Sequence, residues 1–221
     1  HTHVLSHPLV LNHVLPEVVI QLGAPLISSA VDSYVKKAAA DTAKFAYILV
    51  HPSSPGERRD PNYLVTHAFD CPVGSFVRAI ASTPRAPLEV GSDLHVLKNL
   101  DLEVQSLVSG ALEEHASQSG GALNEISAMK IASSFVRRQD AMFVSNSMPI
   151  RDADTFVYES ESSTIMCNRG ASGIDGVLHS AIGAAHALRG GRVTAVIGDV
   201  ATLHDLNALH NLRRGAAEST S

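Results

Sequence analysis

Short apolar runs alternate with longer segments of helical spacing along this chain. The runs at 18–22 and 45–50 are apolar at nearly every position, which is typical of β-strands covered on both faces. Residues 25–40 between them carry apolar side chains at helical spacing. This order predicts a β-α-β unit, with a parallel strand pair joined by a right-handed crossover. A short helix is predicted over 73–80.

The C-terminal half repeats this arrangement. Strands are predicted at 141–144, 164–167 and 193–197, and helices at 124–138, 174–188 and 204–214. Two X-Pro pairs and a Gly-Ser pair within 83–99 are turn signals, so this segment is the predicted linker, followed by a polar helix over 101–118. The chain is therefore predicted to be an α/β protein with two parallel-sheet units: a central domain at 1–95, a linker and helix at 96–121, and a second domain at 122–221.

Composition narrows the possible functions. The chain has 221 residues, is 45% hydrophobic and carries a net charge of −5, so it can bury a core. It shows no basic face for nucleic acid and no apolar run of the roughly 20 residues that a membrane span needs. Cys71 and Cys167 stand in no metal-binding spacing, which fits a reducing compartment.

Twelve histidines are many for this length, and several cluster near the start. His1, His3, His7 and His13 follow no compact ligand spacing and have no cysteine or carboxylate among them. We interpret them as polar loop residues rather than a metal site.

A glycine-rich turn at 167–176 opens an apolar helix, and the strand at 193–197 runs into Gly198-Asp199. Glycines let the backbone approach a phosphate, and a carboxylate at the carboxyl end of a parallel strand can hold a divalent cation. Asp199 could equally cap the following helix. The local pattern does not separate these two roles.

Two arginines follow predicted strands and should lie on the same edge of the second sheet as Asp199. Arg151 and Arg169 suit an anionic ligand, because a guanidinium group binds carboxylates in a bidentate manner. The alternative is that each arginine pairs with a nearby acid. The candidate acids are Asp152, Asp154 and Asp175.

The segments 145–152, 168–176 and 198–209 together resemble the 2-succinyl-5-enolpyruvyl-6-hydroxy-3-cyclohexene-1-carboxylate synthase family, a thiamine-diphosphate-dependent family often called MenD. Further segments at 18–23, 45–50, 59–61 and 64–67 look like the central domain of that family. Those at 45–50 and 64–67 are closest to the fused form of plants and algae. The resemblance covers about residues 8–214, and its most specific part is Asn-Arg-Gly-Ala-Ser-Gly-Ile-Asp-Gly at 168–176.

The resemblance implies three α/β domains, of which this chain would be a fragment holding most of the second and the incomplete first part of the third, diphosphate-binding domain. It implies thiamine diphosphate and Mg²⁺ as cofactors, with Asp199 as a magnesium ligand and Ile174 as the apolar wedge that bends the cofactor. The remaining implied cofactor contacts are Asn146, Gly198, Val200 and Ala201, and the residues implied to hold substrate carboxylates are Ser147, Arg151 and Arg169.

By the same resemblance, the reaction decarboxylates 2-oxoglutarate and adds the product to isochorismate in menaquinone or phylloquinone biosynthesis. Two arginines fit these multiply anionic substrates. The family's active sites form between subunits, so a homo-oligomer is expected. The expected location is the plastid if the source is a plant or alga, and the cytoplasm otherwise. Because domains that complete the family's site lie outside this sequence, the chain alone is expected to be inactive.

Two alternatives remain open at this point. Another thiamine-diphosphate enzyme of the acetolactate synthase or 2-oxoacid decarboxylase type would share much of the pattern, although Arg151 and Arg169 argue against its usually monoanionic substrates. A non-catalytic interaction or regulatory product of the same gene would keep the folded segment without a working site.

Overall fold

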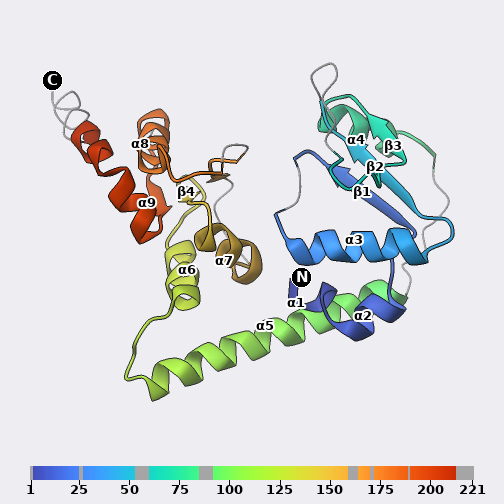
Figure 1. The fold of residues 1–221 in the computed structure, drawn as a ribbon, viewed down its shortest axis with the longest axis horizontal. Coiled ribbons are helices and arrows are strands. Elements are labelled where there is room, and N and C mark those ends of the chain that lie inside the picture. The colour runs from blue at the N-terminus through green and yellow to red at the C-terminus, as the bar shows by residue number, and fades with distance from the viewer. Residues whose placement is uncertain are drawn as a thin grey trace. The chain divides into compact units, whose positions relative to one another are not determined.

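The computed structural model describes residues 2–24, 27–52, 60–84, 92–158, 164–169, 172–188 and 190–212. The chain divides into two compact units, His1–Val108 and Ser109–Ser221. Each unit contains its own three-stranded parallel sheet (Figure 1). The predicted α/β class with two separate parallel sheets is confirmed.

The first sheet has the strand order β1-β2-β3 and is parallel throughout. Its strands are β1 (Val18–Leu22), β2 (Ala46–Val50) and β3 (His67–Phe69). Helix α3 (Ser29–Asp41) connects β1 to β2, and the Ser28 hydroxyl caps it by accepting a hydrogen bond from the Val31 N–H at 3.4 Å. Helix α4 (Val73–Ala81) follows β3. The sequence did not predict β3, because it is only three residues long and all three side chains are exposed.

A helical layer packs against α3 in the first unit (Figure 1). It consists of α1 (Thr2–Leu5), α2 (Pro8–His13) and the first part of α5 (Ser92–Gln118). Val4, Val10 and Tyr34 form its buried centre, and the Tyr34 hydroxyl donates a hydrogen bond to the Val14 carbonyl at 2.5 Å.

Two predictions for this unit were wrong. His3, His7 and His13 do not lie in a polar loop: they lie on or beside two short helices, and His7 caps α2 by accepting a hydrogen bond from the Leu9 N–H. His1 lies outside the described residues. Helix α5 begins at Ser92 rather than near 101, because Leu97 and Leu100 extend its apolar face back onto the helical layer. Residues 92–99 of the predicted linker are therefore helical, and its residues 85–91 lie outside the described part of the chain.

The second sheet has the strand order β5-β4-β6, again parallel. Its strands are β4 (Ala141–Val144), β5 (Thr164–Met166) and β6 (Val193–Val196). The central strand β4 is buried along its whole length. Met142 and Val144 enter one apolar cluster, whereas Phe143 between them enters another, as the alternation of side chains along a strand requires.

Helices cover both faces of the second sheet. On the Met142 face lie α6 (Glu125–Ser134) and α7 (Met148–Phe156), and on the Phe143 face lies α8 (Val177–Ala187). Short helix α9 (Asp199–His204) and the single turn η1 (Leu206–Ala208) follow β6.

Several boundaries in the second unit differ from the sequence prediction. Helix α6 ends at Ser134 rather than at 138. Helix α7 occupies a segment after β4 for which no element was predicted. Helix α8 begins at Val177, because Gly176 just before it adopts a left-handed conformation with φ 67°. The last predicted helix, 204–214, is divided: α9 begins at Asp199, directly after Gly198, and ends at His204, η1 follows, and residues 209–212 are helical again. The predicted end of that helix and the polar tail, residues 213–221, lie outside the described residues.

Asp140 joins the start of β4 to the start of β6. It is 5% exposed, and its carboxylate accepts hydrogen bonds from the Arg192 N–H at 2.9 Å and from the Arg137 N–H at 3.4 Å. The Arg192 guanidinium lies 3.5 Å away. The hydrogen bond from the Arg192 backbone is the main cause that holds the pKa of Asp140 below its ordinary value, against the opposing effect of burial.

This lowered pKa predicts a pH dependence of stability. A carboxylate with a depressed folded-state pKa stabilises the protein above the unfolded pKa, about 3.9 for aspartate, and loses that contribution as pH falls through the folded value. The wild-type chain should therefore exceed Asp140→Asn in unfolding free energy by a constant margin from pH 7 to about pH 5, and the margin should shrink towards pH 2. Urea titrations of both proteins over this range measure the margin, and a margin that grows on acidification would contradict the role given to Asp140.

No helix among the residues that the structure describes combines the length and the apolar character that a membrane crossing demands.

Candidate functional site

The carboxyl ends of β4, β5 and β6 lie at one edge of the second sheet, because all three strands are parallel. The chain leaves β4 towards β5 on one flank, while β6 lies on the other flank. In open α/β sheets, ligands bind in a crevice beyond the carboxyl ends of two neighbouring strands whose following connections run to opposite sides. The ends of β4 and β6 are the expected place for such a crevice here. Val144 lies opposite Val196, and the Ser145 N–H donates to the Val196 carbonyl at 2.9 Å. The segments 146–147 and 198–199 therefore leave neighbouring strand ends.

Asn146 is the most buried of the predicted site residues with a polar side chain, at 6% exposed. Its Nδ2 donates a hydrogen bond to the Gly173 carbonyl at 2.9 Å, across 27 positions of sequence. Its Oδ1 is buried and accepts no hydrogen bond within the described residues. Asn146 thus joins the end of β4 to the turn before α8 and presents one unused acceptor.

Ser147 adopts a backbone conformation that is unusual for a residue with a side chain. Its φ is 72° and its ψ is −129°, and holding a non-glycine residue in such a region costs of order 1–3 kcal/mol. The side chain is exposed, and the residue leads directly into α7. Strain of this kind concentrates at ligand-binding turns.

The two predicted arginines lie at the same edge of the sheet and are exposed. Arg151 is in the first part of α7, with its Nη1 3.8 Å from the Met148 sulfur, and Arg169 lies just beyond β5. The alternative of ion pairing with Asp152, Asp154 or Asp175 is not found among the described residues. Within the described residues, both guanidinium groups are exposed and lack an acidic partner.

Buried Asp152 differs from an ordinary surface acid. Burial raises its pKa, and the negative charge of Glu125 adds to this effect. A carboxyl in such surroundings favours the protonated form more than an exposed aspartate does. A protonated carboxyl carries no charge with which to pair with Arg151.

The turn before α8 holds Ile174, which is half-buried. Gly173 precedes it, and a Cβ there would come within 3.1 Å of an Asp175 carboxylate oxygen. The same Asp175 lies 3.8 Å from His204 Nε2. Gly170 and Ala171 of the glycine-rich turn lie outside the described residues.

Asp199 is the exposed first residue of α9, and the N-cap position belongs to Gly198. The alternative role of Asp199 as the helix N-cap is therefore wrong. No heavy atom lies within 4 Å of the position that a Cβ on Gly198 would take, so there is room for a ligand beside its backbone. Val200 is 61% exposed, whereas the side chain of Ala201 is buried at 5%, so a ligand can meet Ala201 only through its backbone.

His179 and Asp205 form a pair that no sequence pattern indicated. Asp205 lies directly after α9. Its carboxylate accepts from the His179 N–H at 2.9 Å and lies 2.6 Å from His179 Nδ1. Burial opposes its charge, but the hydrogen bonds from His179 outweigh burial and hold the pKa of Asp205 below its ordinary value. The pair spans 26 positions, beyond any local pattern.

No set of three or more histidine, cysteine or acidic side chains converges as a metal site in the part of the chain that the structure describes. Mg²⁺ is commonly held by one or two carboxylates together with water and the phosphates of its ligand. Asp199, with open space beside Gly198, meets that requirement.

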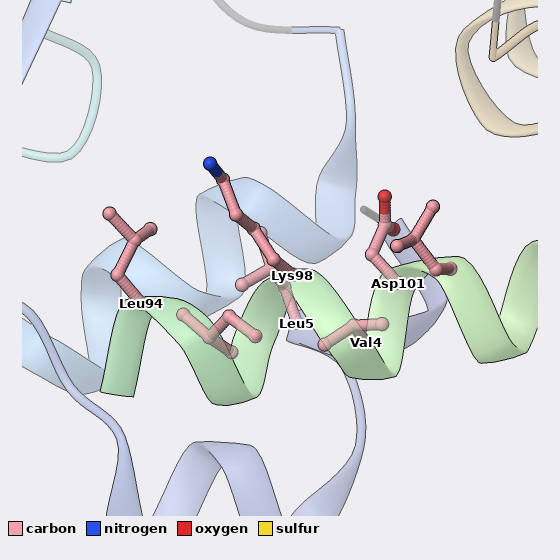
Figure 2. Close-up of a pocket in the computed structure, with 7 residues that line it drawn as sticks. Val4, Leu5, Leu94, Lys98 and Asp101 are labelled. Atoms are coloured by element: carbon pink, nitrogen blue, oxygen red, sulfur yellow. The ribbon is translucent and has the colours of Figure 1, made fainter. Parts of the chain in front are cut away.

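A separate groove lies in the first unit, between α1 and α5 (Figure 2). It has a volume of about 510 Å³ and is lined chiefly by apolar side chains, with Lys98 and Asp101 as its charged residues. The Asp101 carboxylate accepts a hydrogen bond from Gln105 at 2.9 Å. None of the predicted site residues lines this groove.

Comparison with known proteins covers nearly the whole chain. The chain is 34% identical over 97% of its length to Protein PHYLLO, chloroplastic, of Arabidopsis thaliana. It is 32% identical over 94% of its length to the 2-succinyl-5-enolpyruvyl-6-hydroxy-3-cyclohexene-1-carboxylate synthase of Chlorobium phaeobacteroides, and 33% identical over 90% to that of Rubrobacter xylanophilus. Over most of its own length the chain is therefore similar to a segment of this synthase family.

The match to the synthase family covers only part of each relative. The chain spans 35% and 32% of the two bacterial synthases and 13% of the Arabidopsis protein. No protein-family model matches the chain.

Proposed function

We propose that this chain forms the diphosphate- and carboxylate-binding side of a thiamine-diphosphate-dependent synthase of menaquinone or phylloquinone biosynthesis. The observation that carries this proposal is the edge of the second sheet. There, segments 146–147 and 198–199 leave adjacent strands, and two arginines without an acidic partner in the described residues lie at the same edge. The names of the relatives support the same function.

The residues at this edge fit the cofactor. Asp199 would supply a carboxylate oxygen to Mg²⁺, with water and the diphosphate completing the coordination. The open space beside Gly198 would admit the diphosphate along the backbone of 198–201. Ile174 would offer an apolar contact to the cofactor. Bound thiamine diphosphate would supply a centre that stabilises the negative charge left when a 2-oxo acid loses carbon dioxide.

The arginines fit the proposed substrates. Two exposed guanidinium groups and the Ser147 hydroxyl would orient the carboxylates of 2-oxoglutarate and isochorismate, so that the addition joins the correct atoms. A monoanionic 2-oxo acid would need fewer positive charges. We therefore favour the dicarboxylate substrates over those of an acetolactate-synthase-like enzyme.

Two further properties belong to this proposal. The Arabidopsis relative is named chloroplastic, which supports a plastid location if the source is a plant or alga. We also infer a homo-oligomeric synthase, since an exposed site edge on this unit suits closure by a second subunit.

Replacing Arg169 by lysine tests the carboxylate-binding role. In a full-length synthase that carries this segment, Arg169→Lys should lower kcat/KM for the dicarboxylate substrates at least roughly tenfold, because lysine keeps the charge but loses the bidentate geometry. Arg78→Lys, a change at an exposed arginine of α4, is the matched control and should leave kcat/KM unchanged. Equal kinetics for Arg169→Lys and the control would remove Arg169 from the substrate site.

A further inference from the structure

Helix α8 begins at a residue that cannot cap it. The N-cap position belongs to Gly176, which has no side chain to accept a hydrogen bond. The first backbone N–H groups of a helix have no carbonyl partner within that helix, so they need acceptors from outside it. At α8 one such acceptor comes from Asp205, which lies 26 positions beyond His179.

Asp205 contacts α8 through both of its carboxylate oxygens. One oxygen accepts a hydrogen bond from the His179 N–H, in the first turn of the helix, at 2.9 Å, and the other lies 2.6 Å from His179 Nδ1. Asp205 is buried, so little water competes for these oxygens, and its negative charge is favoured at a helix N-terminus. These contacts, the Asp205–His179 joint, hold the start of α8 to the chain that follows α9.

The joint connects two sides of the candidate site. Asp199, which we assign to the metal, opens α9, and Asp205 follows the end of this six-residue helix. Ile174, to which we assign an apolar contact with the cofactor, lies in the turn just before α8. Helices α8 and α9 are neighbours in the second unit (Figure 1). A shift of α9 against α8 would therefore change how Asp199 and Ile174 lie relative to each other.

A second contact links the same ends of α8 and α9 but is weaker. His204 Nε2 lies 3.8 Å from an Asp175 carboxylate oxygen, and the two side chains are 50% and 85% exposed. Pairs exposed to this degree contribute little to stability. The buried carboxylate of Asp205 is therefore the stronger of these two links.

We propose that Asp205 is a positioning residue that fixes the Ile174 turn relative to Asp199, so that one cofactor molecule meets both. This inference rests on the proposed function. Pyrophosphate with Mg²⁺ would contact only the backbone of 198–201 and the metal, so it does not need this alignment. Thiamine diphosphate also carries the apolar part assigned to Ile174, so its affinity depends on the alignment.

The first arm of the test measures stability without ligand. Asp205→Ala removes the joint, and Asp140→Ala is the matched control. Both substitutions delete a buried carboxylate that accepts a hydrogen bond from a backbone N–H, but Asp140 precedes β4 and so lies at the opposite edge of the sheet from the site. Both variants of the full chain should melt roughly 3–10 °C below the parent, as followed by circular dichroism.

The second arm measures binding by ligand-observed NMR up to millimolar concentrations. Asp205→Ala should bind thiamine diphosphate with Mg²⁺ at least roughly tenfold more weakly than the parent, whereas its Kd for pyrophosphate with Mg²⁺ should be unchanged. Asp140→Ala should keep both Kd values. His179→Ala removes only the side-chain half of the joint, so it should weaken thiamine diphosphate alone, by roughly threefold.

The outcomes separate a positioning role from a merely structural one. Equal weakening of both ligands in Asp205→Ala, or a loss no greater than that of Asp140→Ala, would overturn the inference. If Asp205→Ala does not fold, His179→Ala decides: a loss confined to thiamine diphosphate supports the inference, and any other result overturns it.

The same measurements separate the inference from the proposed function. If the parent binds thiamine diphosphate with Mg²⁺ and Asp205→Ala binds it equally well, the inference is wrong and the proposed function stands. If the parent does not bind thiamine diphosphate at all, the proposed function fails and the inference falls with it.

Discussion

Asp199→Asn should weaken the Mg²⁺-dependent binding of thiamine diphosphate by roughly 100-fold. The substitution keeps the size of the side chain and removes the carboxylate that we assign to the metal. Loss of a residue that merely orients a metal ligand already costs about 10–100-fold in affinity, so loss of the ligand itself should reach at least the upper end of that range. Titrations with and without Mg²⁺, on a full-length synthase carrying this segment, measure the effect.

The control for Asp199→Asn is Glu114→Gln, which makes the same change of charge at an exposed position of α5. This variant should bind like the parent, because a distant surface charge is screened. An equal loss of affinity in both variants would show a general charge effect. Unchanged affinity in Asp199→Asn would remove Asp199 from the metal site.

Gly191→Ala should lower the free energy of unfolding by at least about 2 kcal/mol. A Cβ at this position would lie 2.2 Å from the Gln139 carbonyl oxygen and 2.8 Å from a Leu188 methyl carbon. The carbonyl belongs to the backbone just before β4, so it cannot move aside as a side-chain tip can. Relief of the clash must therefore displace the start of β4 or the chain entering β6. Urea denaturation of the two proteins measures the difference.

Gly183→Ala provides the opposite expectation within the same unit. Gly183 lies on the exposed side of α8, and no atom outside its own helix lies within 4 Å of the position that a Cβ would take there. Alanine favours the helix over glycine by about 0.8–1.0 kcal/mol, so this variant should be more stable than the parent. If both alanine variants change the free energy of unfolding in the same direction, the clash of a Cβ with the Gln139 carbonyl does not explain the effect at Gly191.

The strands of the core were predictable because their signal is local. Residues 141–144 are apolar and buried on both faces, and the predicted boundaries of β4 agree with the structure. Strand β3 carries no such signal because all three of its residues are exposed. The helix at 92–99 was missed, since the turn signals of 83–99 outweighed the apolar residues Leu97 and Leu100, which pack against α1, α2 and α3.

The sequence could predict which residue types form the candidate site and at which edge of the sheet they lie, since each candidate follows a strand or opens a helix. It could not predict the hydrogen bonds between them. The contact from Asn146 to Gly173 and the pair of His179 with Asp205 join residues 27 and 26 positions apart, and only the packing of α8 against the sheet determines them. The strain at Ser147 likewise depends on how α7 begins, which the sequence did not indicate.

The most direct test of a diphosphate and magnesium site at this edge is an amide NMR titration of the ¹⁵N-labelled chain with thiamine diphosphate, with and without Mg²⁺. We predict Mg²⁺-dependent shifts concentrated at Asn146, Ser147, Gly198 and Asp199, together with the turn at 173–176. Shifts confined to the groove between α1 and α5, or no shift at millimolar ligand, would contradict the assignment of this edge as the cofactor site.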